Sequence, residues 1–211
     1  MPADVDLPRP GLRERKKAKT RAAIQQHALR LFREQGYDAT TIEQIADAAE
    51  VSPSTFFRYF PTKEDVALYD ALDPLVFAAF QAQPPELSPV RAMREAMREV
   101  VAGLSPEELR DMEARMDLIR DVPELRARTL DEYGRAIDLM TELVANRTGC
   151  RADDLAVRAL AGAVVGVSIA IMLTPGKLSG GEMFARIDAA LELMEEGFPL
   201  AIQPPHPHST G

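Results

Sequence analysis

The segment from residue 40 to residue 65 constrains the fold most, because it contains three helix starts within a short stretch. Thr40, followed three positions later by Glu43, has the pattern of a capping box, whose side chains bind the free N–H groups at a helix start. Ser52 predicts a second start, with Pro53 at the first helical position, where a missing N–H costs nothing. The few residues between these helices leave room only for a tight turn. The pattern is typical of a helix-turn-helix, whose second helix fits the major groove of DNA.

A third helix start follows directly and limits the length of the second short helix. Pro61 disfavours helical conformation in the residue before it, so we expect that helix to end there. Thr62 and Asp65 have the spacing of another capping box. We therefore predict a helix-turn-helix over about residues 41–60, within an N-terminal domain of residues 12–72.

The residues upstream of this motif supply positive charge. Between Arg9 and Arg33 lie nine basic residues and one acid, Glu14. The whole chain carries a formal charge of −8, and its acids concentrate after Lys63, so a basic end is joined to an acidic body. A basic segment leading into a helix-turn-helix is the electrostatic pattern of phosphate binding. Taken alone, the segment also fits a solvated arm; beside the turn motif, it indicates a double-stranded DNA partner.

The motif lies within a longer run that resembles a known family. From about Lys19 to Tyr69 the chain is similar to the N-terminal DNA-binding domain of TetR-family transcriptional regulators. The pairs Leu31-Phe32 and Gly36-Tyr37, and the five residues that begin at Phe60, carry the resemblance. It implies an all-α protein with a three-helix N-terminal domain and a helical C-terminal domain. It also implies a repressor, less often an activator, that binds a palindromic operator as a homodimer and releases it when a small molecule enters the C-terminal domain.

Matched position by position, the resemblance assigns DNA-facing roles to the short helices. Residues that open the recognition helix are implied to face base edges, and those in its next turn to reach bases and backbone. Residues at the starts of the second and fourth helices are implied to touch phosphates. The residues that open the recognition helix are Ser52, Pro53, Ser54 and Thr55, and those of its next turn are Phe57, Arg58 and Tyr59. The residues at the starts of the second and fourth helices are Thr41 and Lys63.

Three of these positions need separate comment. The family often has glycine where Ser54 stands and tyrosine where Phe57 stands. Phe57 has no hydroxyl to donate to a phosphate, so van der Waals contact with a thymine methyl or a sugar remains. Lys63 lies in the first turn of a helix, where a cation opposes the macrodipole. A phosphate bound beside the helix N–H groups explains this placement; neutralisation by Glu64 and Asp65 is the alternative.

The residues after the motif predict helices and no convincing strands. Proline and glycine clusters divide the apolar periodicity into segments, and two of them begin with a serine cap followed by proline. We expect a C-terminal ligand-binding and dimerisation domain over residues 73–202. The first expected helix runs from 66 to 80 with a kink at Asp73-Pro74, and the second from 88 to about 103. A third begins at 105, and a fourth begins at 123 and ends at a loop over 146–151. The last two are expected over about 152–173 and over 181–196.

The last two of these helices are candidates for a subunit interface. Residues 159–173 carry no charge, but they fall short of the roughly 20 residues that a bilayer requires, so we expect a buried helix and no membrane span. Small residues recur every four positions along it, which lets another helix approach closely. The resemblance implies that both helices build a four-helix interface with a second subunit; burial inside one subunit is the alternative. The expected interface residues are Gly162, Gly166, Ala170, Phe184, Ile187 and Leu191.

The middle helices carry the residues expected to bind a small molecule. Methionine and aromatic side chains at helical spacing suit an apolar, adaptable cavity, and plain core packing is the alternative. The C-terminal two-thirds resembles, more loosely, the mycofactocin-regulator branch of the family, which implies acyl-CoA-like ligands. Arg115, Arg120 or Arg128 would then pair with phosphate or carboxylate; salt bridges on the helix surface are the alternative. The expected lining is Phe77, Phe80, Met93, Met97, Met112, Met116, Arg120, Tyr133 and Met140.

Composition narrows the remaining functional classes. The sequence has no Gly-rich phosphate loop, no nucleophile elbow and no paired metal-ligand motif, so we expect no enzyme, metal site or cofactor. Cys150 is the only cysteine, which excludes an internal disulfide, and no secretory signal is visible; both favour the cytoplasm. We expect residues 1–10 and 203–211 to be disordered. A ligand-responsive transcriptional regulator fits best, with a constitutive DNA-binding regulator, or an activator without an inducer, as the alternative.

Overall fold

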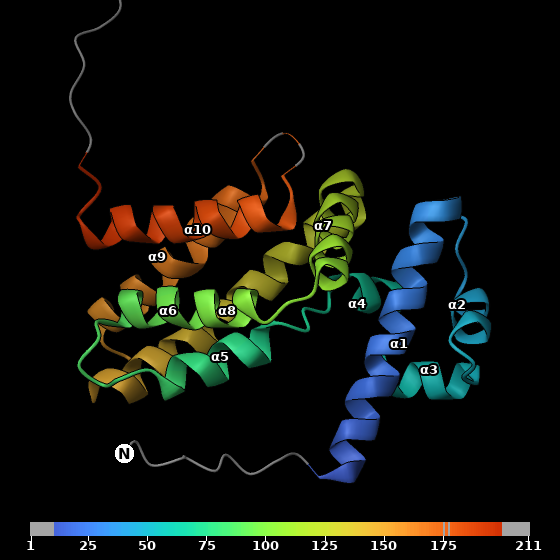
Figure 1. The fold of residues 1–211 in the computed structure, drawn as a ribbon, viewed down its shortest axis with the longest axis horizontal. Helices are drawn as coiled ribbons and strands as arrows, with labels where there is room; N and C mark the ends of the chain where they lie inside the picture. The colour runs from blue at the N-terminus through green and yellow to red at the C-terminus, as the bar shows by residue number, and fades with distance from the viewer. Residues whose placement is uncertain (1–10, 175, 177, 200–211) are drawn as a thin grey trace, which may run out of the picture.

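The computed structural model describes residues 11–174, 176 and 178–199, and this part of the chain folds into helices without a strand. The segments expected to be disordered, 1–10 and 203–211, lie outside the described residues. Figure 1 shows α1, α2 and α3 at one end and a larger helical group at the other, with α4 and α7 between them. The all-α prediction is confirmed. The helices are α1 (Leu12–Gln35), α2 (Ile42–Ala48), α3 (Pro53–Tyr59), α4 (Lys63–Leu68), α5 (Asp73–Ala82), α6 (Pro89–Ala102), α7 (Pro106–Asp121), α8 (Pro123–Thr148), α9 (Leu155–Met172) and α10 (Gly180–Glu195).

Most predicted helix starts are confirmed, because side-chain caps act over three residues of sequence. The Ser52 hydroxyl accepts a hydrogen bond from the Thr55 N–H at 3.1 Å, and Pro53 occupies the first turn of α3. At α4, Thr62 and Asp65 form the predicted capping box. Serine caps begin α6, α7 and α10 in the same way.

One predicted cap is shifted by one residue. The capping box of α2 joins Thr41 and Gln44 instead of Thr40 and Glu43. Thr40 is buried, and its hydroxyl donates to the Gly36 carbonyl at 2.7 Å, so it secures the end of α1. Thr41 therefore caps α2 and Thr40 binds the end of α1, and the sequence pattern alone does not tell which threonine faces the interior.

The turn between α2 and α3 is a Schellman motif. The Val51 N–H donates to the Ala46 carbonyl at 2.9 Å, and the Glu50 N–H donates to the Asp47 carbonyl at 3.0 Å. Glu50 adopts a left-handed conformation with φ of 53°, which is unusual for a residue with a Cβ atom. Val51 then packs against the N-terminal core. These contacts end α2 sharply and direct the chain into the recognition helix.

Two predicted helix boundaries after the helix-turn-helix were wrong. The helix expected over 66–80 is two helices, because the Asp70 carboxylate accepts from the Leu72 N–H at 2.9 Å and holds a bend between α4 and α5. The loop expected at 146–151 is shorter, since α8 continues until Gly149, whose φ of 70° ends it in the left-handed region.

Helices α1–α4 enclose a small core that residues of the later helices complete. Phe56 is fully buried in it and Phe60 is 2% exposed. Leu125, at the start of α8, is also fully buried in this N-terminal core, and Leu118 and Val122 pack against it. The packing unit of the DNA-binding helices therefore extends beyond the predicted boundary at residue 72, because it includes the α7–α8 junction.

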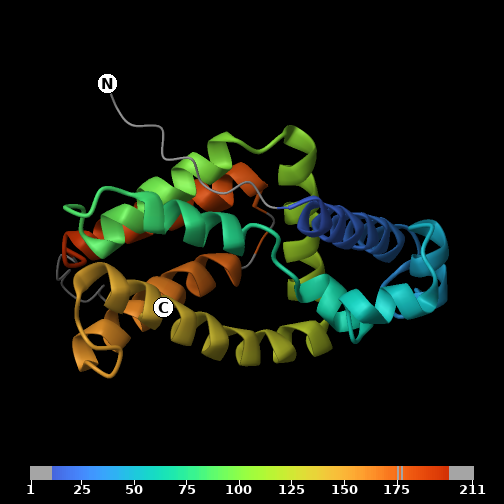
Figure 2. The same ribbon diagram turned by 90° about the horizontal axis from the view of Figure 1, so that it is seen from below.

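Helices α5–α10 form the second core, which a buried ion-pair network closes on one side. Figure 2 shows α8 running along this group and reaching the N-terminal helices. Arg94 of α6 is 6% exposed and pairs with Asp188 at 3.1 Å, Glu192 at 2.8 Å and Glu195 at 3.5 Å. A buried guanidinium is tolerated only when such partners surround it. Three carboxylates of α10 thus fix the last helix against α6.

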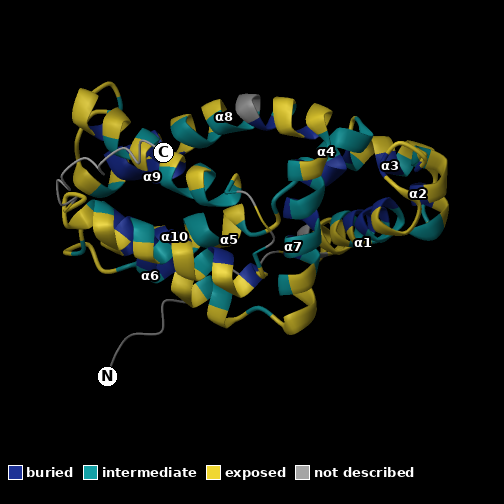
Figure 3. Ribbon diagram, turned by 90° about the horizontal axis from the view of Figure 1, so that it is seen from above, coloured by how far each residue is buried: buried dark blue, intermediate teal, exposed yellow. Residues whose placement is uncertain are grey.

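The predicted interface residues divide between the interior and the surface. Ile187 and Leu191 were wrong as interface residues: they are 4% and 0% exposed within one subunit, because the inward face of α10 completes the second core. Phe184 is partly buried, as is Gly162, whereas Gly166 and Ala170 are exposed. Figure 3 shows exposed residues along the outward sides of the helices and buried ones toward the interior.

Helix α9 has an unusual surface for a core helix. Of the helices in the described chain, it is the one long and apolar enough to cross a bilayer by length and composition, with a mean hydropathy of 2.1. Only 22% of this stretch is buried in the subunit. Much of its apolar surface is therefore left uncovered by the helices of its own chain.

Candidate nucleic-acid interface and ligand cavity

The recognition helix α3 is anchored on one side and exposed on the other. Phe56 fixes the anchored side in the N-terminal core, and its ring meets the Phe57 ring edge-on at 5.6 Å. Phe57 itself is 51% exposed. The exposed residues of this face are Ser52, Pro53, Ser54, Phe57 and Arg58, while Thr55 and Tyr59 are partly exposed.

Three hydroxyl groups gather at the start of α3. The Ser52 oxygen lies 2.9 Å from that of Ser54 and 3.0 Å from that of Thr55. Each hydroxyl carries one donor and two acceptor sites, so the group keeps hydrogen-bonding capacity beyond these contacts. Thr41, the cap of α2, is exposed as well. This arrangement presents rotatable donors and acceptors of the kind that read base edges.

Lys63 reaches back to the turn between α1 and α2. Its ammonium donates to the Tyr37 carbonyl at 2.9 Å and to the Thr40 carbonyl at 3.3 Å, and it lies 4.2 Å from the Tyr37 ring centre. Neither Glu64 nor Asp65 forms an ion pair with it among the described residues; their carboxylates accept from Tyr37, Thr62 and Arg128 instead. An ammonium has three N–H donors, so one remains for a further acceptor.

The basic segment is split between solvent and interior. Several lysines of the first turns of α1 are exposed, with side chains free to face a phosphate backbone. Arg9 lies outside the described residues. The exposed lysines are Lys16, Lys17 and Lys19.

Arg21 departs from this pattern because it turns inward. Its guanidinium donates to the Tyr59 carbonyl at 3.2 Å and lies 4.7 Å from the Tyr69 ring centre and 5.4 Å from that of Phe60. Such stacking partly replaces the hydration of the cation. Arg21 therefore ties α1 to the end of the recognition helix, and charge counting along the sequence does not distinguish it from the lysines.

A cavity of about 860 Å³ lies among α5–α10 and extends to the N-terminal helices. Its volume is within the range of small-molecule sites. Seven of the nine predicted lining residues border it: Phe77, Met93, Met97, Met112, Met116, Tyr133 and Met140.

The other two predicted lining residues lie elsewhere. Phe80 is 1% exposed and packs in the second core, where the Arg147 guanidinium lies 5.3 Å from its ring centre. Arg120 pairs with Asp117 on its own helix. Of the arginines considered for the cavity mouth, Arg115 borders the cavity. Arg128 instead binds Asp65 at 2.9 Å.

Sequence reasoning missed one end of the cavity. Tyr59, Phe60 and Pro61, which end the recognition helix, border it together with Arg21. These residues come from the N-terminal helices, whereas the predicted lining residues all lie between Phe77 and Met140. Their place depends on how the two helical groups meet, and no local pattern signals it.

The polar part of the cavity contains one acid without a partner. Arg115 is 6% exposed; it pairs with Asp70 and donates to the Leu68 carbonyl at 3.3 Å. The carboxylate of Asp73, in the first turn of α5, has no hydrogen bond or ion pair among the described residues. Burial, and then the charge of Asp70, raise the pKa of Asp73 to about 7, although Arg115 acts in the opposite direction. By accessible surface Asp73 is exposed, and it borders the cavity, so water in the cavity screens its charge and moderates the effect of burial.

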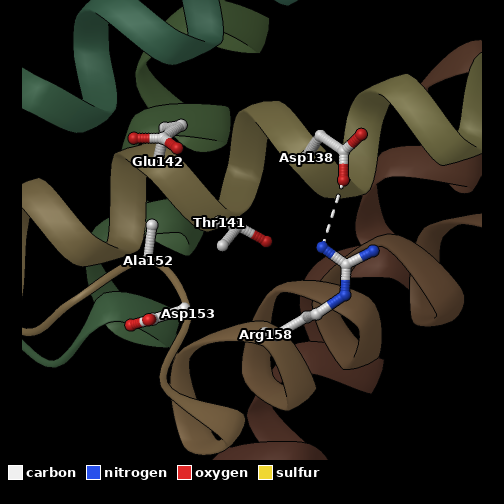
Figure 4. A pocket seen from close by; sticks show the side chains of 6 residues that line it. All are labelled: Asp138, Thr141, Glu142, Ala152, Asp153 and Arg158. Atoms are coloured by element: carbon white, nitrogen blue, oxygen red, sulfur yellow. Dashed lines mark hydrogen bonds and ion pairs between the residues drawn. The ribbon is translucent and has the colours of Figure 1, made fainter.

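A second hollow lies at the surface between α8 and α9 (Figure 4). It is bordered mainly by charged side chains, and Arg158 crosses it to bind Asp138 at 3.2 Å. No group of three histidine, cysteine or acidic side chains suited to a metal ion occurs in the described part of the chain. This hollow lacks the apolar lining of the larger cavity.

Comparison with known proteins gives a family match for the N-terminal helices and another for the C-terminal helices. A family model described as bacterial regulatory proteins of the tetR family matches residues 24–69. A second, described as the MftR C-terminal domain, matches residues 87–199. The first range contains the helix-turn-helix, and the second contains most of the cavity lining.

Individual relatives agree with the family models. The HTH-type transcriptional regulator TcmR of Streptomyces glaucescens is 35% identical over 92% of this chain and 85% of its own length. The putative mycofactocin biosynthesis transcriptional regulator MftR of Mycobacterium tuberculosis is 26% identical over 74% of this chain and 79% of its own. The crystal structure of Thermus thermophilus FadR, a TetR-family repressor in complex with lauroyl-CoA, is 25% identical with a TM-score of 0.50, covering 89% of this chain and 98% of its own.

The unpaired acid predicts a pH-dependent stability. A carboxyl group whose pKa rises on folding stabilises the fold while it is protonated, and that contribution is lost as the pH rises from the unfolded pKa of about 4 through the folded value. Asp73→Asn should therefore raise the free energy of unfolding more at pH 8 than at pH 5. We expect a difference of about 1 kcal/mol, less than the pKa shift alone implies, because cavity water screens the charge.

Urea titrations at the two pH values measure this difference. Asp138→Asn, which changes an exposed acid in the second hollow, is the matched control and should respond alike at both. An equal effect of Asp73→Asn at pH 5 and pH 8 would show that the cavity hydrates this carboxylate as bulk water does.

Proposed function

Because the chain belongs to the tetR family of bacterial regulatory proteins, we propose that it is a repressor that binds a palindromic operator as a homodimer and releases it when an apolar or acyl-bearing small molecule enters the cavity. The relatives named above are transcriptional regulators and not enzymes. In a bacterium such a regulator acts in the cytoplasm, where the chromosome lies.

The observation that carries this proposal is the shared border between cavity and recognition helix. Tyr59, Phe60 and Pro61 line the cavity at the point where α3 ends and α4 follows. A molecule that fills the cavity therefore presses on the residues that orient the recognition helix. It shifts the DNA-binding equilibrium only by the difference between its affinities for the two states. A constitutive regulator would have no use for this connection.

The lining favours an effector with a long apolar part. Methionines from five helices, α6 to α10, provide flexible, polarisable walls that adapt to a chain or a ring. Thermus thermophilus FadR, to which this chain is similar, was solved with lauroyl-CoA, and this supports an acyl chain as one candidate. The match to the MftR C-terminal domain over residues 87–199 covers the same helices.

The DNA-binding surface is proposed to be the exposed face of α3 with its flanking helix starts. The hydroxyls of Ser54 and Thr55 would read base edges, and Phe57 would contact a thymine methyl or a sugar. Tyr59, Thr41, the third N–H of Lys63 and the lysines of α1 would bind phosphates. In this proposal, residues 12–72 bind the operator and residues 73–202 hold the effector and the second subunit.

The proposed subunit interface uses the outward faces of α9 and α10. On α9 these are small apolar side chains at helical spacing, and on α10 they continue to Leu193, which is 46% exposed. A second copy related by a two-fold axis would cover the apolar surface that α9 leaves open, and it would place two recognition helices on one palindrome. The residues concerned are Ala159, Ala163, Gly166 and Ala170 of α9, and Ala185, Ala189 and Leu193 of α10.

The first prediction from this proposal concerns DNA contact. Lys63→Ala should weaken binding to all sequences alike and lower the slope of log affinity against log salt concentration by about one unit, since one phosphate contact is lost. Thr55→Val, which removes a hydroxyl, should change the preferred operator and leave the slope unaltered. Fluorescence-anisotropy titrations at several salt concentrations measure both effects.

The carbonyl contacts of Lys63 require a control for folding. Thermal melts of Lys63→Ala establish the temperature range in which the variant is fully folded, and binding is measured within it. A lower melting temperature with an unchanged salt slope would assign Lys63 to the fold alone and contradict the phosphate contact.

The second prediction concerns release. Acyl-CoAs of suitable chain length should raise the melting temperature and displace the operator in gel-shift assays. Ala136→Trp, which fills part of the cavity, should retain operator binding and lose displacement. Ala78→Trp, on the exposed side of α5, is the matched control. Displacement that survives Ala136→Trp would contradict binding in this cavity; stabilisation by polycyclic aromatics and by no acyl compound would contradict the acyl effector only.

The third prediction concerns assembly. A Cβ atom at Gly166 meets no atom within 4 Å in the described subunit, so Gly166→Leu leaves one subunit intact and obstructs the proposed interface. Light scattering after size exclusion should give twice the 23.2 kDa chain mass for the wild type and a single chain for Gly166→Leu, with loss of operator binding. Gly134→Leu, an equally open glycine of α8, is the control. A single-chain mass for the wild type at micromolar concentration would contradict the dimer.

A further inference from the structure

The charges around Asp73 leave a surplus of negative charge in the cavity wall. The groups that act on Asp73 are the carboxylates of Asp70 and Glu132 and the guanidinium of Arg115. Arg115 is paired with Asp70, and Glu132 is paired with Arg135 on α8. Each of these acids has a cation of its own, and Asp73 has none among the described residues. The unbalanced charge therefore falls on the acid that borders the cavity.

A hydroxyl group without a partner lies in the same region. The Tyr133 oxygen is buried and has no hydrogen-bond partner among the described residues, although Tyr133 borders the cavity. Arg115, Tyr133 and Asp73 all border the cavity, and the charge of Arg115 acts to lower the pKa of both other groups. Burial raises the pKa of the Tyr133 phenol, so it stays a neutral hydroxyl. A buried polar atom without a partner costs free energy that a ligand recovers by bonding to it.

We propose that Asp73 and Tyr133 form the polar subsite of the cavity, which accepts a hydrogen-bond-donating group of the effector, an ammonium or a hydroxyl, and discriminates against a carboxylate. This inference rests on the proposed function, since it names the chemistry of the molecule that enters the same cavity. The apolar part of that molecule lies along the methionines, and its donor reaches Asp73. The Tyr133 hydroxyl accepts from the same group or donates to its oxygen.

The arginines of the cavity do not reverse this preference. Arg115 already divides its charge among the surrounding carboxylates, and a ligand carboxylate would add another anion to that group. Arg21 also borders the cavity, where its guanidinium stacks on the rings of Tyr69 and Phe60 and donates to the Tyr59 carbonyl.

Three probes that share one alkyl chain and differ in the head group test the subsite. They are decylamine, which is protonated at pH 8, 1-decanol and decanoate, and isothermal titration calorimetry at that pH measures their affinities for the full chain. We expect decylamine to bind at least about tenfold more tightly than decanoate, because a subsite built for a donor leaves its acid unpaired, or beside a like charge, when a carboxylate enters. Asp73→Asn should reduce this ratio to within about threefold.

The companion variants separate the subsite from the fold. Tyr133→Phe should lower the affinity for 1-decanol by about threefold, because one neutral hydrogen bond is lost. It should leave the preference for decylamine over decanoate in place. Asp138→Asn should change neither ratio. Thermal melts confirm that each variant is folded.

Each outcome decides the inference. Decanoate binding as tightly as decylamine to the wild type overturns it, as does a preference for decylamine that survives Asp73→Asn. Absence of binding by all three probes also overturns it. The proposed function is judged separately, by operator binding and by its displacement with acyl-CoAs, so a carboxylate-preferring cavity that still controls operator release would leave that proposal standing.

Discussion

The arrangement of the whole chain depends on one apolar contact, the insertion of Leu125 into the core of the DNA-binding helices. This residue begins α8, the longest helix, and it is fully buried among side chains of α1–α4. Removing such a side chain from water contributes about 2 kcal/mol, and the contact also fixes where α8 points. Since α8 then borders the cavity and packs on α9, the position of the ligand-binding half follows from it.

Helix α4 packs against α1 on one side and against α7 and α8 on the other, so it contacts both helical groups. Gln25 of α1 donates to the Val66 and Tyr69 carbonyls, at 3.1 Å and 2.6 Å. From the other side, Arg115 of α7 donates to the Leu68 carbonyl, and Arg128 of α8 donates to the Asp65 carboxylate. This short helix is thus held by one amide and two guanidinium groups from three other helices. In the proposed function, these hydrogen bonds would carry a change in the cavity wall to α4, which follows the recognition helix directly in the chain.

The distribution of charge separates binding to DNA from holding the fold together. Exposed lysines gather at the start of α1, while Arg94, Arg98 and Arg115 of the later helices are engaged in ion pairs. The Arg94 network is the clearest example, because three carboxylates of α10 surround one buried guanidinium. The net charge of −8 is that of the whole chain, whereas the segment that leads into the helix-turn-helix is basic.

The sequence by itself determined the features that local chemistry controls. Ser52, Thr62 and Ser105 marked helix starts correctly, because a cap needs only residues three positions apart. The methionine pattern indicated five of the residues that border the cavity. The tertiary structure alone decided the rest. It set the inward turn of Arg21, the place of Leu125 in the N-terminal core, and the burial of Leu191 within one subunit. These depend on which helices meet in space, and residues far apart in the chain make those contacts, so no spacing along the sequence encodes them.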